Sequence, residues 1–278
     1  MAYPTVNGPY GLLPYNLLGG RVEAGSTRMY PIASGLADNL NYGDVVVLSS
    51  GTLSKSGFAA PTTTQAAAAG TLGVFLGCEY SVANGVILGK NRYQNWAGGT
   101  TSPDAVAYIC DDPNQIFKAC AVVNNGTATS TSLAMVAPAI LGSNLLYVNN
   151  YSSTVPKSGN STAGVCLGTS SARITSATSP FRVVQLVQES SLITTTTLTV
   201  ATSATQTPAS MTGIYPGMLL AGSGVTAGTY VVSITATQFV ASASFTSVAS
   251  AVYTFTGYPE VLVTWNPAYQ AYNTAGAA

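Results

Sequence analysis

The side chains that carry out most protein chemistry are scarce in this chain. Its 278 residues include no histidine and only nine acidic and nine basic residues. Histidine is the commonest general base, a frequent zinc ligand and a member of the usual serine and cysteine triads. Two carboxylates can serve a glycosidase, but the one conspicuous pair, Asp111 and Asp112, is adjacent in sequence and so points to different sides of a strand or turn. We therefore expect that the protein is not an enzyme.

Two loop patterns resemble ligand sites but are better interpreted as turns. Residues 111–113 (Asp-Asp-Pro) are typical of a turn, or of the N-cap and first position of a short helix. The alternative is a calcium site completed by Asp104 or Asn114. Residues 222–228 are rich in glycine, but they lack the Lys-Ser/Thr pair of a phosphate loop and the GxGxxG spacing, which favours a tight β-turn.

The cysteines and the charges exclude further classes of function. Cys78, Cys110, Cys120 and Cys166 are widely spaced without a CxxC pair, which favours buried, reduced thiols. We expect no metal and no cofactor. Charged residues make up 6% of the chain, against about 25% in ordinary globular domains. The formal net charge is zero, so no basic face is expected to bind nucleic acid or an anionic membrane.

This shortage of charge also predicts what the surface of the protein contacts. Free soluble proteins usually keep a mixed charged surface and a net charge away from zero, which limits association. We therefore expect much of this surface to contact other protein, or to be covered by uncharged polar residues. The chain has no run of about 18 apolar residues, and its start lacks the basic and apolar regions of a signal peptide, so we expect synthesis in a cytoplasm.

Short strand patterns dominate the rest of the chain. Each is rich in β-branched or aromatic residues and bounded by Gly, Pro, Asn, Asp or Ser, which predicts an all-β fold, a β-barrel or a β-sandwich. The six clearest segments are residues 45–48, 73–77, 106–110, 117–123, 181–187 and 261–265. The alanine run 66–69 lies between threonines and a glycine, and we interpret it as a loop or a single turn.

Residues 1–40 have a different character and are predicted to be an extended N-terminal arm. Prolines and glycines interrupt a stretch of tyrosines and leucines, which leaves little scope for regular structure. Such an arm can cover its own domain or dock on a neighbouring subunit by adding main-chain hydrogen bonds to a sheet. The candidate capsid or subunit contacts are Tyr3, Tyr10, Leu12, Leu13, Tyr15, Leu17, Leu18, Arg21 and Arg28.

A second distinct segment, residues 190–259, contains no charged residue. It alternates short apolar stretches with threonine, serine and turn residues, which predicts a small β module inserted into the main domain. The main β domain then comprises residues 41–189 and 260–278, with segments 181–187 and 261–265 as neighbouring strands. Insertions are tolerated at exposed loop tips, so we expect the module to project outward.

Several sequence blocks, in order, resemble capsid decoration (cement) proteins of marine and cyanobacterial tailed bacteriophages. They include GPYGLLPYN from residue 8, NYGDVVVLSSGTL from residue 41, TLGVFLGCEY from residue 71 and SPFRVVQLV from residue 179. The resemblance covers about residues 1–189 and the final strand. Within the insertion, GSGVTAGTYVVSI from residue 222 looks like a small β module found in phage head and tail proteins.

The resemblance implies a structural function on the virion. Such proteins are implied to be made in the host cytoplasm and to bind the capsid exterior over joints between major capsid protein subunits, often as homotrimers or homodimers. The main alternative is a tail or fibre protein that contacts host surface glycans, with tyrosines and Trp96 as a sugar-binding platform. No catalytic residues are implied by either likeness.

Overall fold

A computed structural model describes residues 9–55, 71–81, 91–121, 140–148, 159–166, 179–187, 193–198, 202–214, 218–226, 229–246, 250–256, 260–268, 270 and 272. In this part of the chain the nineteen regular elements are all β-strands, arranged in four antiparallel sheets. The predicted all-β class is therefore confirmed. None of the described residues forms a helix long and apolar enough to cross a membrane. The alanine run 66–69 lies outside the described residues.

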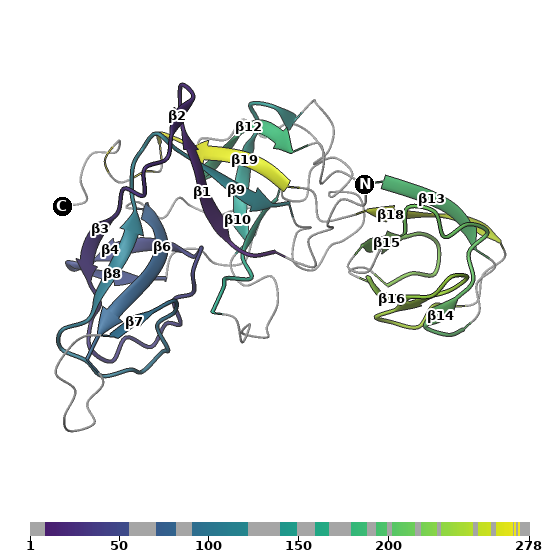
Figure 1. The fold of residues 1–278 in the computed structure, drawn as a ribbon, viewed down its shortest axis with the longest axis horizontal. Helices are drawn as coiled ribbons and strands as arrows, with labels where there is room; N and C mark the ends of the chain where they lie inside the picture. The colour runs from purple at the N-terminus through teal and green to yellow at the C-terminus, as the bar shows by residue number, and fades with distance from the viewer. Residues whose placement is uncertain are drawn as a thin grey trace.

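The largest sheet has seven strands and combines strands from the N-terminal part of the chain with a strand from the C-terminal part (Figure 1). Its order is β11 (Gly164–Cys166), β10 (Asn144–Val148), β12 (Phe181–Val187), β19 (Glu260–Trp265), β9 (Gln115–Cys120), β1 (Leu12–Leu17) and β2 (Arg21–Val22). Strand β12 pairs with β19, with Phe181 opposite Trp265 and Val187 opposite Glu260. This confirms that the two strands flanking the uncharged segment are neighbours.

A second sheet of six strands lies beside the first. Its order is β3 (Arg28–Pro31), β8 (Val106–Cys110), β6 (Thr71–Tyr80), β4 (Val45–Ser49) and β5 (Thr52–Ser54), and β7 (Asn91–Tyr93) pairs with β6. Strand β6 is buried along most of its length, as expected for a central strand with both faces covered. The predicted segments 45–48, 73–77 and 106–110 all lie in strands of this sheet.

The two sheets share one hydrophobic core. It combines Phe117, Phe181 and Trp265 of the seven-stranded sheet with Val45 and Val74 of the six-stranded sheet. The Trp265 ring stacks on Phe181 at a centroid distance of 4.9 Å and meets Phe117 edge-on at 5.3 Å. A second core, which includes Trp96, covers the opposite face of the six-stranded sheet. Neither sheet closes into a barrel, so the body is a sandwich of open sheets.

The uncharged segment forms two three-stranded sheets with a core of their own (Figure 1). One sheet contains β13 (Ile193–Leu198), β18 (Ala251–Thr256) and β15 (Leu219–Ala221), and the other contains β14 (Thr205–Gln206), β17 (Phe239–Ala241) and β16 (Val231–Ile234). The buried residues of this core all lie between Leu198 and Phe255. The hydroxyl of Tyr253 on β18 donates a hydrogen bond at 2.7 Å to the carbonyl of Ser223, which lies in the turn after β15.

The N-terminal segment is more regular than its composition indicated. Strand β1 pairs with β9, and β3 pairs with β8, so residues predicted to form an arm contribute to both sheets of the body. The physical reason is that the main chain of β1 pairs with β9 of its own chain, while Leu12 fills the shared core. A local pattern of prolines and glycines does not reveal such long-range pairing.

Candidate functional site

The predicted contact residues lie on or next to β1, β2 and β3, of which β2 is an edge strand of the seven-stranded sheet and β3 an edge strand of the six-stranded sheet. Leu12, Leu13, Tyr15 and Leu17 belong to β1, Leu18 to the following turn, Arg21 to β2 and Arg28 to β3, with Tyr10 just before β1. Tyr3 lies outside the described residues. We call the exposed side chains of β1, β2 and β3 the edge surface.

Strand β1 divides its side chains between the core and the edge surface. Leu12 is 0% exposed and packs in the shared core, so the prediction that it contacts a partner is wrong. Leu13, the next residue, is paired with Lys118 on β9, and its side chain points to the opposite face of the sheet from that of Leu12. The register shifts between Pro14 and Asn16, and Tyr15 at this irregularity is 50% exposed. An irregularity of this kind re-aims a side chain away from the pattern of the ladder.

The turn between β1 and β2 holds the edge surface in a fixed shape. Gly19 and Gly20 have φ angles of +84° and +76°, a left-handed conformation that glycine adopts without steric strain. The N–H of Leu18 donates to the Asn114 carbonyl at 2.8 Å, which ties the hairpin to the turn between β8 and β9. Val22, in the outer strand of this hairpin, is 80% exposed. The hairpin therefore exposes the Val22 side chain, while a main-chain hydrogen bond holds the turn of the hairpin in place.

Strand β3 carries the second part of the edge surface. Met29 is 67% exposed, and Pro31 lies on the same edge strand. Proline lacks an N–H donor, so it weakens any added strand at this edge. Strand β2 has only two residues, which also limits strand addition. The edge surface is therefore suited to side-chain packing with a partner rather than to main-chain pairing.

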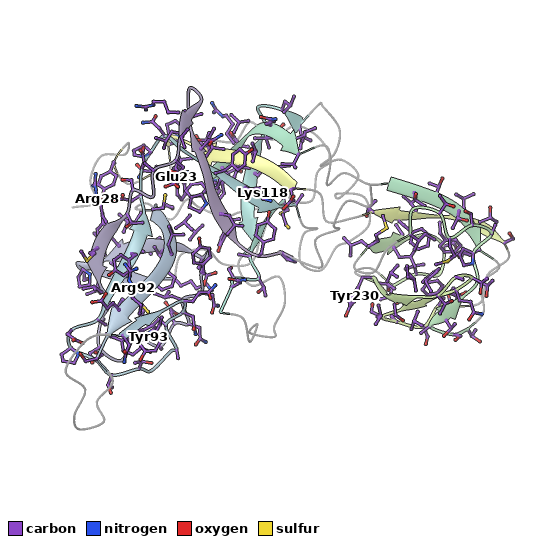
Figure 2. All side chains as sticks on the ribbon, in the orientation of Figure 1. Glu23, Arg28, Arg92, Tyr93, Lys118 and Tyr230 are labelled. Carbon is purple, nitrogen blue, oxygen red and sulfur yellow. The ribbon has the colours of Figure 1, made fainter. Side chains whose placement is uncertain are left out.

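Arg28 is held in place by a cluster that the sequence did not reveal. Its guanidinium lies 3.6 Å from the Asp111 carboxylate and 5.1 Å from the centre of the Tyr272 ring (Figure 2). The hydroxyls of Tyr30 and Tyr272 both donate to Asp111, at 2.7 and 2.8 Å, which brings the two hydroxyl oxygens next to each other. The Asp111 carboxylate raises the pKa of Arg28, and burial raises the pKa of Tyr30. These contacts hold Tyr272 against Arg28 and Tyr30 of β3.

The Asp-Asp pair forms a turn, as the sequence predicted. Asp112 accepts a hydrogen bond from the N–H of Asn114 at 2.7 Å, between β8 and β9. Asp104, the candidate third ligand of a calcium site, instead accepts hydrogen bonds from Ser81 and Ser102. Within the described ranges, no three His, Cys, Asp or Glu side chains are grouped as metal ligands.

Tyr10 lies at the base of the inserted module, away from the edge surface. Its hydroxyl donates to Glu260, whose carboxylate also pairs with Lys118 at 3.0 Å. The Lys118 ammonium lies 5.8 Å from the centre of the Tyr10 ring. Next to it, Cys120 of the body packs against Leu219 of the module. Burial raises the pKa of Tyr10, so its hydroxyl stays protonated as the donor to Glu260. Tyr10 thus joins parts of its own chain.

The structure also shows where Trp96 and the four cysteines lie. Trp96 is 0% exposed in the second core, so Trp96 does not form part of a sugar-binding platform. All four cysteines are buried and none forms a disulfide, which confirms the prediction of buried, reduced thiols. Burial raises the pKa of Cys78 and of Cys110 to about 12.

The edge surface is thus an anchored apolar surface of the body, with Tyr15, Val22 and Met29 as its most exposed apolar members. The sequence identified some of its residues, because the run of tyrosines and leucines near the N-terminus is conspicuous. It did not identify Val22 and Met29. Exposed valine and methionine carry no local signal. Comparison with protein-family models, with curated proteins and with solved structures finds no match.

Proposed function

We propose that the protein is a structural subunit of a bacteriophage virion that binds the capsid exterior and stabilises contacts between major capsid protein subunits. The observation that carries the proposal is the edge surface, where Tyr15, Val22 and Met29 are at least half exposed on an anchored framework. Exposed apolar side chains that lie near one another favour a protein partner, and Val22 is paired with Asn16, the residue after Tyr15. Aromatic residues and methionine are also enriched in protein interfaces.

The low charge of the chain supports the same proposal. With only nine acidic and nine basic residues, the protein has little charge to oppose close packing with neighbours. The few charges near the edge surface, such as Arg28 in its pair with Asp111, can fix the register of a contact more than its affinity. The partners we propose are the major capsid protein and further copies of this chain.

The proposed mechanism is thermodynamic. A subunit that binds the assembled shell, but not its free components, stabilises the shell by mass action. The stabilisation is about 4 kcal/mol for each site at a thousandfold excess over the dissociation constant. Repeated at symmetry-related sites, this free energy opposes rupture of the shell. The body contributes the contact, and the module, joined at β12 and β19, extends away from it (Figure 1).

A second candidate function is host contact by a tail or fibre protein. It is favoured by strand β16 of the module, where Val232 and Ile234 are exposed at alternate positions and Tyr230 is exposed just before the strand. The same module has no charged residue that would select a charged partner. The two candidates differ in stoichiometry, because a capsid lattice offers many equivalent sites and a tail offers few.

The experiment is to measure the copy number in purified virions by quantitative mass spectrometry. Hundreds of copies support capsid decoration, and a dozen or fewer favour the tail or fibre function. Particles lacking the protein are then incubated with the purified chain and sedimented. Val22→Asp places a charge in the edge surface and is expected to abolish co-sedimentation, while Val184→Asp, a partly exposed valine on β12, is the matched control. Equal binding by both variants would contradict the assignment of the edge surface.

A further inference from the structure

A hollow of about 220 Å³ lies on the six-stranded sheet, and none of its lining residues belongs to the edge surface, although Tyr108 is paired with Met29. It is bordered by the residue before β3 and by strands β6, β7 and β8. Figure 2 labels Arg92 and Tyr93 on β7, at one side of it. The residues that matter for the argument are Thr27, Leu76, Gly77, Arg92 and Tyr108.

The hollow exists because β6 departs from regular pairing at this point. The register between β6 and β8 shifts between Phe75 and Cys78. Gly77 in this interval has a φ of +128°, and a Cβ atom there would lie 2.9 Å from the Tyr93 carbonyl oxygen. Only glycine permits this close approach of β7. Irregularities of this kind are common next to binding sites, because they open the ladder and redirect side chains.

Arg92 and Tyr108 border the hollow, and both contact Glu79, which lies beside them on β6. The Tyr108 hydroxyl donates to a Glu79 carboxylate oxygen at 2.7 Å. The Arg92 Nε lies 3.9 Å from the same oxygen, and the guanidinium lies 4.6 Å from the centre of the Tyr108 ring. Arg92 is 75% exposed at its side chain, against 27% for Glu79. The three side chains therefore present both hydrogen-bond donors and an acceptor, with no net charge.

These properties restrict the ligand. Glu79 beside the hollow disfavours a phosphate or a nucleotide, and a purely apolar ligand would make no hydrogen bond with Arg92 or Thr27 at its border. The cavity is smaller than the 300–1,000 Å³ that is typical for drug-sized ligands, which favours a ligand of a single small ring. Neighbouring hydroxyls of a sugar can accept from an arginine and donate to a carboxylate, while Leu76 and Tyr108 supply apolar contact.

We propose that this hollow binds one neutral pyranose ring of a carbohydrate. Arg92 and Thr27 bind ring hydroxyls, Glu79 accepts from a neighbouring hydroxyl, and Tyr108 holds the Glu79 carboxylate in position. The site uses residues of the body alone, so it does not depend on the capsid function proposed above. It also differs from the idea of a platform around Trp96, because Trp96 is buried.

The test is saturation-transfer NMR on the purified full-length chain with methyl glycosides of glucose, galactose and mannose, and with N-acetylglucosamine and glucuronate. At least one neutral sugar is expected to bind. Arg92→Ala and Glu79→Gln are each expected to weaken that binding about tenfold, the loss of one hydrogen bond to a charged group, about 1.4 kcal/mol. Arg182→Ala, at another exposed arginine, is the matched control and is expected to bind like the unaltered chain.

Three outcomes would overturn the proposal. The first is that no sugar binds, the second that only glucuronate binds, and the third that Arg92→Ala binds as well as Arg182→Ala. Circular dichroism of each variant checks that the fold is retained, and Arg92 is exposed enough that its removal leaves no cavity. Because the measurement uses the isolated chain, its failure leaves the copy number in virions unaffected, and the two proposals are tested separately.

Discussion

The buried ion pair between Lys55 and Asp44 offers the sharpest test of how the body is held together. The two charged atoms are 2.7 Å apart, and their side chains are 7% and 0% exposed. Asp44 also accepts from the Asn41 N–H at 2.7 Å and from the Ser161 hydroxyl at 2.5 Å. Since Ser161 precedes β11 of the seven-stranded sheet and Asp44 precedes β4, this one carboxylate connects the two sheets.

Lys55→Met and Asp44→Leu are expected to lower the free energy of unfolding by different amounts. Breaking a buried pair by removing one partner costs about 3–5 kcal/mol. Lys55→Met should lie near 3 kcal/mol, because the Asp44 carboxylate keeps its other donors, among them the Asn41 N–H and the Ser161 hydroxyl. Asp44→Leu should cost about 5 kcal/mol or more, because the buried lysine loses its carboxylate and the Asn41 N–H and the Ser161 hydroxyl lose Asp44 as an acceptor. The double variant should lose less than the sum, because neither charge remains unpaired.

Tryptophan fluorescence during urea unfolding measures these losses in the body alone. The chain has two tryptophans, Trp96 and Trp265, and both are buried in the body cores. A loss of 3 kcal/mol shifts the urea midpoint by about 1 M or more. Arg92→Met, which removes the cation of an exposed pair, is the control and should leave the midpoint unchanged. A loss below about 1 kcal/mol for Lys55→Met would refute the reasoning, because it would mean that the buried pair adds little.

Two further predictions concern the thiols and the inserted module. Because burial raises the pKa of Cys78 and Cys110 to about 12, almost no thiolate forms at pH 8, so neither should react with Ellman's reagent until denaturant is added. Rapid reaction of a thiol in the native protein would contradict the burial. Replacing the residues between Val187 and Glu260 with a short turn should leave the body folded, because these two residues are paired across adjacent antiparallel strands. An unchanged urea midpoint for tryptophan fluorescence checks this, and an insoluble or non-cooperative product would argue that the module is needed for folding.

Local sequence patterns predicted the strands well where a short apolar run is bounded on both sides by turn residues. Segments 45–48, 106–110, 181–187 and 261–265 are short β-branched runs between turn residues, and each lies within a strand of the structure. The pairing of β12 with β19 was predicted because an uncharged insertion separates two similar strands. By contrast, β1 was not predicted, because its partner β9 lies about a hundred residues away and the local pattern is interrupted by proline.

The candidate site was predicted only in part, for a related reason. The sequence identified Tyr15 and Arg28, which lie on the edge surface, but also Leu12, which lies in the core. Leucines next to each other in a strand point to opposite sides, and the register decides which one is buried. The hollow beside Arg92 could not be predicted, because it depends on an irregularity at Gly77 and on three strands that the topology brings together.

By itself, the sequence determined the all-β class, the location of the uncharged segment and the scarcity of groups for acid–base chemistry, because these follow from composition and from local periodicity. Tertiary structure decided that the body is an open sandwich and that the N-terminal segment is part of it. It also decided that Asp111 receives two tyrosine hydroxyls and that Asp44 joins the sheets. These features depend on contacts between residues 81 to 161 positions apart, which no local pattern specifies.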